Sequence, residues 1–263
     1  MRRGWVEAGG RRLETGWWGP PPEAAPSIVL LHEGLGCVAL WRGFPEKLAE
    51  ATGCGVFAWS RAGYGASDPI TPPRPLDYMQ IEAAECVRPV LDAAEVQDCI
   101  LVGHSDGGSI AALYAGTHDD PRVRGLALLA PHVFVEDISI QGIEDARARY
   151  LGTDLRERLG RYHADVDGAF WGWNRAWLDP AFRDWNITPD CAGIRVPTLV
   201  VQGLADPYGT AAQVEALRTV AGEHVRPLLL EGVGHAPHLE ATAATLAAVA
   251  GLAAEIWPPV GPR

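Results

Sequence analysis

A serine in a glycine-rich segment is the first residue whose surroundings suggest chemistry. The sequence GHSDG at 103–107 has the pattern G-x-S-x-G, directly after an apolar run and directly before a helix-compatible segment. A sharp turn between a strand and a helix leaves the hydroxyl of Ser105 exposed above the sheet, and small neighbours make room for that turn. The pattern predicts that Ser105 is a nucleophile.

A serine hydroxyl is a weak nucleophile at neutral pH, so it needs a base, and the base needs a carboxylate that holds its tautomer. Asp206 ends the sequence VVQGLAD, and His235 lies in LLLEGVGHAPHLE, each just past an apolar run. We therefore expect Ser105 to attack an acyl carbon, His235 to take its proton and later activate water, and Asp206 to orient His235.

Six short apolar runs bounded by turn residues predict the strands that must position these side chains. Runs that are apolar on both faces are typical of buried parallel strands. Strands that alternate with helices imply an α/β fold, with a mostly parallel sheet covered on both faces. The predicted strands are 27–31, 55–59, 99–102, 126–129, 198–201 and 227–230, and the predicted helices are 41–52, 78–94, 107–117, 210–221 and 242–256.

The alternation stops between about 131 and 190, where helical patterns rich in Arg and Trp replace strand-like runs. We expect residues 1–130 and 191–263 to form one α/β core and residues 131–190 to form an inserted helical cap.

Taken together, these motifs resemble the α/β-hydrolase superfamily over nearly the whole chain. They are the elbow at Ser105, the G-x-x-D turn at Asp206, the segment GHAPHLE around His235, the apolar strand before His32, and RAGYGASD at 61–68, which is similar to R-x-G-x-G-x-S. The order Ser, acid, His is that of the family. The resemblance implies the α/β-hydrolase fold and a serine hydrolase. Relatives that open epoxides or remove halides carry aspartate at the elbow, which disfavours those reactions here.

The oxyanion of the tetrahedral intermediate needs preorganised N–H donors, and one should be the amide of Asp106. The resemblance implies a second donor in the loop after the first core strand, commonly H-G-x-G, where this chain has HEGLG at 32–36. The Gly34 amide is favoured, with Leu35 as the alternative. Glu33 replaces the usual glycine and brings a carboxylate close to the developing charge. We expect it to point away and bond to local backbone; the alternative is that it holds water or a cationic substrate group.

Aromatic side chains are concentrated in the predicted cap. Together with Glu33, we expect Trp171, Trp173 and Trp177 to line an apolar or aromatic acyl pocket over Ser105, the alternative being that several form the cap's own core. The cap arginines are expected on a solvated helix face, although Arg175 or Arg183 would suit a substrate carboxylate.

Composition restricts the partners. The 263 residues carry a formal net charge of −11 with a pI near 5.1, which disfavours binding to nucleic acid and to anionic membranes. Five widely spaced cysteines without a C-x-x-C pair argue against zinc and redox chemistry and favour a reducing cytoplasm. There is no run of about 18 apolar residues and no signal-peptide pattern, so we expect neither secretion nor membrane insertion.

These observations predict a cytoplasmic carboxylesterase, monomeric or homodimeric, that acts on a small molecule without a metal or cofactor. The same triad also cleaves thioesters, amides and the C–C bond of vinylogous diketones, and some relatives use peroxide in place of water. A small-molecule receptor of the same fold is a further alternative.

Overall fold

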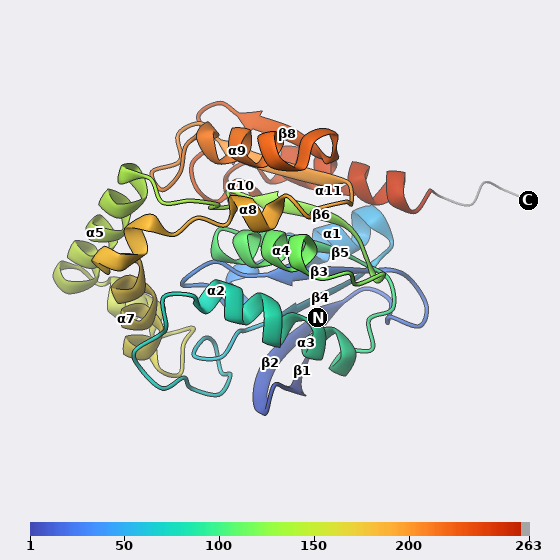
Figure 1. Ribbon diagram of the computed structural model, residues 1–263. Coiled ribbons are helices and arrows are strands. Elements are labelled where there is room, and N and C mark those ends of the chain that lie inside the picture. The colour runs from blue at the N-terminus through green and yellow to red at the C-terminus, as the bar shows by residue number, and fades with distance from the viewer. Residues whose placement is uncertain (259–263) are drawn as a thin grey trace, which may run out of the picture.

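A mostly parallel sheet of eight strands forms the centre of the protein, whose computed structural model describes residues 1–258. The strand order is β1-β2-β4-β3-β5-β6-β7-β8 (Figure 1). The pairs from β4 to β8 are parallel, whereas β1 and β2 run antiparallel at one edge. This confirms the predicted fold class. Residues 259–263 of the predicted core lie outside the described residues.

All six predicted strands are present. Two have the predicted bounds, and the other four extend two or three residues further. Their residues are almost all buried except at the edge strand β8, as expected for strands covered on both faces. The strands are β3 (Ser27–Leu31), β4 (Gly55–Trp59), β5 (Cys99–His104), β6 (Val123–Leu129), β7 (Thr198–Gly203) and β8 (Val225–Leu230).

A hairpin at the N-terminal edge was not predicted. It consists of β1 (Arg2–Ala8) and β2 (Arg11–Trp18), joined by Gly9 and Gly10 with φ of 58° and 70°. Two residues at positive φ favour a two-residue hairpin turn, so the Gly-Gly pair was a usable signal. The strand β1 is mostly exposed and rich in charge, and for that reason it lacks the apolar run that marks the other strands.

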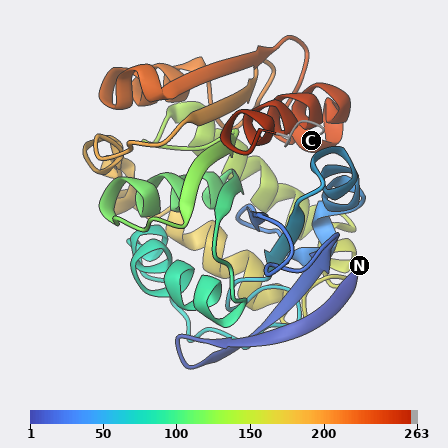
Figure 2. The same ribbon diagram turned by 90° about the vertical axis from the view of Figure 1, so that its right-hand side faces the viewer.

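Helices cover both faces of the sheet (Figures 1 and 2). On one face lie α2 (Tyr78–Ile81), α3 (Val87–Ala93), α4 (Asp106–Thr117), α8 (Thr188–Cys191) and α9 (Ala211–Ala221), and on the other α1 (Phe44–Thr52) and α11 (Thr242–Ile256). The predicted helix at 78–94 is interrupted by a π-helical turn, Glu82–Cys86. Short 3₁₀ turns complete the set: η1 (Val38–Trp41), η3 (Pro180–Asp184) and η4 (Gly222–His224).

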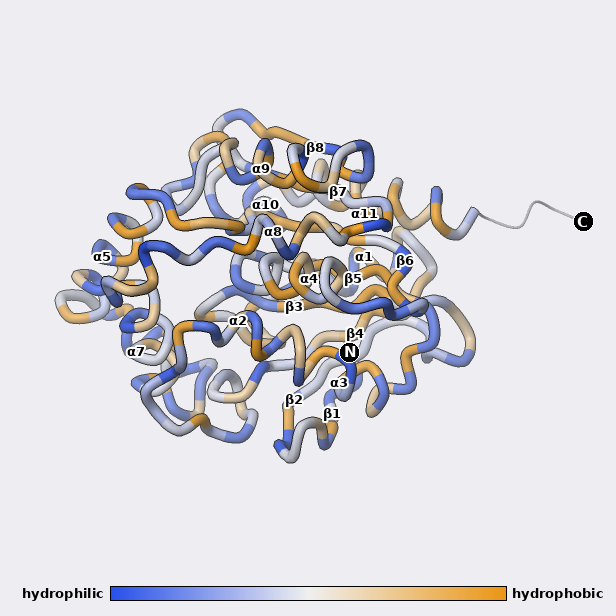
Figure 3. Tube along the Cα trace, viewed as in Figure 1, coloured by the Kyte–Doolittle hydropathy of each residue, from blue (hydrophilic) through white to orange (hydrophobic). Residues whose placement is uncertain are grey.

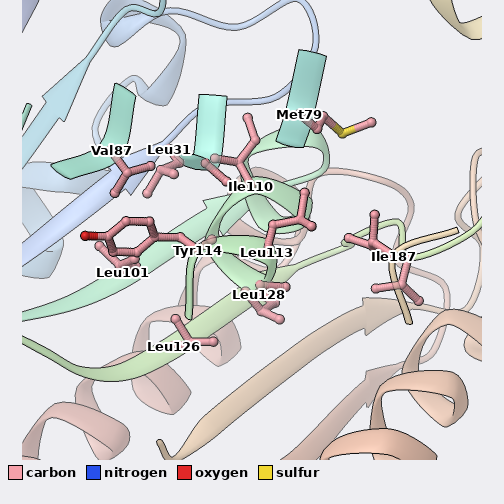
Figure 4. Packing of buried hydrophobic residues seen from close by; sticks show 14 of the residues in the cluster. Leu31, Met79, Val87, Leu101, Ile110, Leu113, Tyr114, Leu126, Leu128 and Ile187 are labelled. Atoms are coloured by element: carbon pink, nitrogen blue, oxygen red, sulfur yellow. The ribbon is translucent and has the colours of Figure 1, made fainter. Parts of the chain in front are cut away.

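The central helix α4 packs on β5 and β6 and is itself flanked by α2 and α8. Every residue from Asp106 to Tyr114 is therefore buried. Figure 4 shows Ile110, Leu113 and Tyr114 of this helix against Leu101 and Leu128 of the sheet. The central strands are correspondingly hydrophobic along their length in Figure 3.

The helices α5 (Asp137–Gly152), α6 (Leu155–Leu159) and α7 (Val166–Trp177) lie between β6 and β7 and pack on one another at one end of the sheet, on the left in Figure 1. The short helix α8 packs on α4 and α9, so the core resumes before the predicted boundary at residue 191. None of the helices within residues 1–258 is long and apolar enough to cross a bilayer.

The turn from β5 to α4 has no room for a side chain at Gly107, because a Cβ there would overlap the carbonyl oxygen of Leu31. We expect Gly107→Ala to lower the free energy of unfolding by about 1–3 kcal/mol or more, because the clash is with backbone that cannot move aside. Urea unfolding followed by circular dichroism measures this change.

Gly251→Ala is the matched control, since a Cβ at this exposed position of α11 meets nothing within 4 Å. It should raise the free energy of unfolding by about 0.5–1 kcal/mol, because alanine is the better helix former. Equal effects of the two substitutions would contradict the packing described for the turn.

Candidate active site

Ser105 occupies the turn between β5 and α4 with φ of 52° and ψ of −119°. A non-glycine residue at this φ is strained, and the surrounding structure must hold it there. The Ser105 amide donates to the Leu129 carbonyl on β6 (2.9 Å), and the Ser109 amide donates to the Ser105 carbonyl (3.0 Å). A Cβ at Gly103 would overlap the backbone of Gly107, so both elbow glycines are required.

Asp206 follows β7 and is almost completely buried. Its Oδ2 accepts from His235 Nδ1 (2.8 Å) and from Gln202 Nε2 (2.9 Å), and its Oδ1 accepts from the Tyr208 amide (2.8 Å). Burial raises the pKa of Asp206, but the hydrogen bond and charge of His235 lower it more, so the net pKa lies below the usual range. The carboxylate is therefore ionised and directed at the imidazole.

His235 lies in the loop between β8 and α10 (Pro237–Glu240), and hydrogen bonds on both sides hold this loop. The carboxylate of Glu240 accepts from the amides of Gly234 (2.7 Å) and Ala236 (2.9 Å). The His235 carbonyl lies 2.7 Å from Nε2 of His104. Since Asp206 holds Nδ1, the other ring nitrogen of His235 remains available as a base.

Ser105 and His235 line one cavity of ≈ 100 Å³, so the fold brings together the serine, histidine and aspartate predicted from the sequence. The cavity lies between the ends of the core strands and the helices α5 and α7. It is lined by Glu33, Gly34, Leu35, Ser105, Asp106, His132, Ser139, Ile143, Trp173, Trp177, Tyr208 and His235.

The predicted oxyanion donors also border this cavity. Asp106 is the first residue of α4, where an amide has no acceptor within the helix. In the part of the chain that the structure describes, the amides of Gly34 and Leu35 make no hydrogen bond to protein, and both residues line the cavity. Either loop amide can therefore serve with that of Asp106.

Residues 26–176, more than half of the chain, match the family described as "alpha/beta hydrolase fold". The chain belongs to the α/β-hydrolase fold family.

Relatives of this family resemble the chain to different extents. A non-heme chloroperoxidase from Burkholderia pyrrocinia is 25% identical over 182 residues, which are 57% of this chain and 64% of that protein, less than two thirds of its length. A hydrolase from Pseudomonas aeruginosa has a TM-score of 0.73 and 21% identity, with 95% of this chain and 98% of that one covered. An enol-lactonase from Burkholderia xenovorans has a TM-score of 0.70 and 20% identity, with 95% and 99% covered. At these identities the two structures show a shared fold.

The carboxylate of Asp106 belongs to a buried network of polar side chains. Its Oδ2 accepts from the hydroxyl of Tyr78 (2.5 Å), and that hydroxyl accepts from Nε1 of Trp177 (3.0 Å). The guanidinium of Arg61 lies 4.0 Å from the same oxygen. The link from Asp106 through Tyr78 to Trp177 was not predicted from the sequence.

Glu33 differs from its prediction. Its Oε2 lies 3.4 Å from Nδ1 of His104, a buried histidine of β5 that was not among its expected partners. The carboxyl side chain is 28% exposed and borders the cavity. The sequence did not indicate this pair because the strand β4 and several helices lie between Glu33 and His104, so no local pattern connects the two residues.

Two of the three tryptophans predicted for the substrate pocket, Trp173 and Trp177, line the cavity that holds Ser105, whereas Trp171 does not. Trp173 and Trp177 are four residues apart on α7 and share one helix face, whereas Trp171 points about 200° away from Trp173. It borders a separate surface pocket beside Arg175, whose guanidinium lies 5.3 Å from its ring.

Other aromatic side chains of residues 131–190 pack on one another, in agreement with the alternative that several of them form a small core of their own. Phe170 stacks on Tyr150 with ring centroids 3.6 Å apart, and Phe182 packs on Trp177 and Trp185. Neither arginine proposed for a substrate carboxylate lines the cavity: Arg175 lies at the separate pocket, and Arg183 pairs with Asp137 (2.6 Å) at the surface.

Four cavity residues were not predicted: His132, Ser139, Ile143 and Tyr208. His132 donates through Nε2 to the Tyr208 carbonyl (3.1 Å), which also accepts from the Ser139 hydroxyl (2.5 Å). Burial lowers the pKa of His132 to about 4, so the ring is neutral beside His235, with ring centroids 5.7 Å apart. The usable signal for His132 was its place directly after the apolar run 126–129, because residues past the end of a parallel strand border ligand sites.

Within residues 1–258, no three His, Cys, Asp or Glu side chains lie together in a way that could hold a metal ion, and the five cysteines are free thiols.

The bond between Tyr78 and Asp106 provides a test of the network under the cap. We expect Tyr78→Phe to lower the free energy of unfolding by about 1–3 kcal/mol, because it leaves one oxygen of a buried carboxylate without its donor. Thermal and urea unfolding measure the effect. Tyr162→Phe is the control, since that side chain is 39% exposed, and it should change stability by less than about 0.5 kcal/mol. A similar small loss in both variants would contradict a structural role for the bond.

Proposed function

We propose that this chain is a serine hydrolase that forms an acyl-enzyme on Ser105, with a small carboxylic ester as its substrate. One observation carries the proposal: a serine at a strained elbow and a histidine held by a buried carboxylate open onto the same small cavity. The alternatives of a structural protein or a simple binding module give no reason for these three side chains to converge.

The proposed reaction has two halves. The Ser105 hydroxyl attacks the acyl carbon while Nε2 of His235 takes its proton, and the imidazolium is stabilised by Asp206. The amides of Asp106 and Gly34 donate to the oxyanion of the tetrahedral intermediate. His235 then protonates the departing alcohol, and a water that it deprotonates attacks the acyl-enzyme and releases the acid.

The size and walls of the cavity favour a small acyl group. Its volume of ≈ 100 Å³ is well below the roughly 300–1,000 Å³ of sites for drug-sized ligands. Leu35, Ile143, Trp173 and Trp177 supply apolar walls, which suit short aliphatic or compact aromatic acyl chains. The carboxylate of Glu33 at the edge disfavours an acyl group that carries its own negative charge.

The first test compares native protein with Ser105→Ala on a matched panel of aryl esters, acyl thioesters, an amide and a vinylogous diketone. We expect turnover of small neutral esters, with kcat/KM reduced by about 10⁵-fold or more in the variant, because the nucleophile is lost. Ser27→Ala, a change at a buried serine at the start of β3, is the control and should retain activity.

The panel also separates the alternatives. Preferred turnover of the thioester or the diketone keeps the same triad but changes the substrate class. Tight binding of panel compounds without repeated turnover favours a receptor. Ester hydrolysis that survives in Ser105→Ala contradicts the proposal.

The two tryptophans of α7 test the assignment of the acyl pocket. We expect Trp173→Leu to shift the preferred acyl chain toward longer esters, by about tenfold in the ratio of kcat/KM for hexanoate over acetate, because methylene selectivity is worth about 1–3 kcal/mol. Trp171→Leu is the matched control on the same helix and should leave the ratio unchanged, since Trp171 borders a different pocket. Equal shifts in both variants would place the acyl pocket elsewhere.

A further inference from the structure

Glu33 places a carboxylate in the loop whose amides are proposed to bind the oxyanion. It directly precedes Gly34, borders the cavity that holds Ser105, and is partly exposed. A negative charge so close to a developing oxyanion opposes the reaction, because like charges in a desolvated site repel strongly. The chain must therefore compensate this charge if the loop is to assist catalysis.

His104 is placed to provide that compensation. It ends β5 directly before Ser105, is 3% exposed, and its Nδ1 lies 3.4 Å from Oε2 of Glu33. Its Nε2 lies 2.7 Å from the carbonyl oxygen of His235, which accepts hydrogen bonds only, so Nε2 carries a proton. A second proton on Nδ1 makes the ring an imidazolium that donates to the His235 carbonyl through Nε2 and faces the Glu33 carboxylate as an opposite charge.

We propose that His104 is a positioning residue which, as an imidazolium, neutralises Glu33 beside the oxyanion site and holds the backbone of His235. The inference rests on the proposed acyl-enzyme function and adds a charge requirement to it. Glu33 and His104 thus form one ion pair, which connects the loop at 32–36 with the loop that carries His235.

The groups around His104 support this protonation state. Burial lowers the pKa of His104, but the nearby carboxylate of Glu33 and the other groups that act on the ring raise it, so the net pKa lies above its ordinary value. Two more rings face it: His238 at 4.7 Å between centroids, with its pKa lowered to about 3 mainly by burial, and His235 at 5.1 Å. The charge of Asp206 acts in the same direction as that of Glu33.

The groups on the other side of Glu33 do not supply the missing charge. Burial lowers the pKa of both His32 and His163, which leaves these rings neutral at pH 7. Arg61 donates to the backbone carbonyl of Glu33 (3.0 Å), and its charge faces Asp106. Arg42 acts on His238 and lowers its pKa further. His104 is therefore the cation at the Glu33 carboxylate.

The consequence is a decline of activity at alkaline pH. Since the pKa of His104 is raised, the neutral pair is complete below that pKa and is lost as the pH rises through it. Above it, Glu33 keeps its negative charge while His104 is neutral, and the uncompensated carboxylate then opposes the oxyanion. The alkaline limb thus belongs to His104.

Glu33→Gln and His104→Gln test this assignment by kcat/KM profiles from about pH 5 to about pH 10 with phenyl acetate in a pH-stat. The native enzyme should lose activity on the alkaline side by about tenfold, or 1.4 kcal/mol. Glu33→Gln should lack this decline, because glutamine has no charge to uncover. His104→Gln, which keeps a donor toward His235, should be about tenfold slower at all pH values, and the double variant should regain the Glu33→Gln rate.

A readout without turnover keeps this proposal distinct from the proposed function. Histidine ¹⁵N NMR in the Ser105→Ala background should show one doubly protonated ring titrating above pH 6.5, shifted down by Glu33→Gln and absent in His104→Gln. A normal or depressed titration, or an alkaline limb that persists in Glu33→Gln, would overturn the pair. Absence of ester turnover with the expected titration would instead overturn only the proposed function.

Discussion

The sharp turn at Ser105 is the constraint on which the rest of the site depends. A residue other than glycine at φ of 52° stays there only because its amide and carbonyl are both bonded, to β6 and to α4. The turn also requires glycine at 103 and 107, where strand and helix backbones touch. A central strand and a helix buried from Asp106 to Tyr114 are thus needed to present one hydroxyl to the cavity, which explains why the elbow lies in the middle of the sheet.

The partners of Ser105 come from loops that the same sheet brings to its end. Asp206 follows β7 and His235 follows β8, and adjacent parallel strands place these loops side by side. A buried carboxylate is costly unless it is fully hydrogen-bonded, and three donors satisfy Asp206. Glu240 fixes the histidine loop from the other side, so the orientation of the imidazole is set before a substrate arrives.

Specific hydrogen bonds connect the helical segment 131–190 to the loops around Ser105. His163 accepts a hydrogen bond from the Gly65 amide and donates one to the Leu35 carbonyl, so it links residues 131–190 to the loop at 32–36. Trp177 reaches Asp106 through Tyr78 while its ring borders the cavity. The shape of the cavity and the position of the loop at 32–36 therefore both depend on side chains of residues 131–190.

The sequence predicted the parallel sheet, the bounds of α1, α4, α9 and α11 to within about three residues, and the turns that carry Ser105, Asp206 and His235, because buried strands appear in a sequence as apolar runs and the turns after them as short local motifs. The exposed β1–β2 hairpin lacked that apolar signal, although its Gly-Gly turn was legible. Three features became visible only in the folded chain: Glu33 pairs with His104, Asp106 accepts a hydrogen bond from Tyr78, and Trp171 lies outside the cavity. The two contacts join segments far apart in the chain, and the position of Trp171 depends on which face of α7 points to the cavity. No local sequence pattern indicates these features.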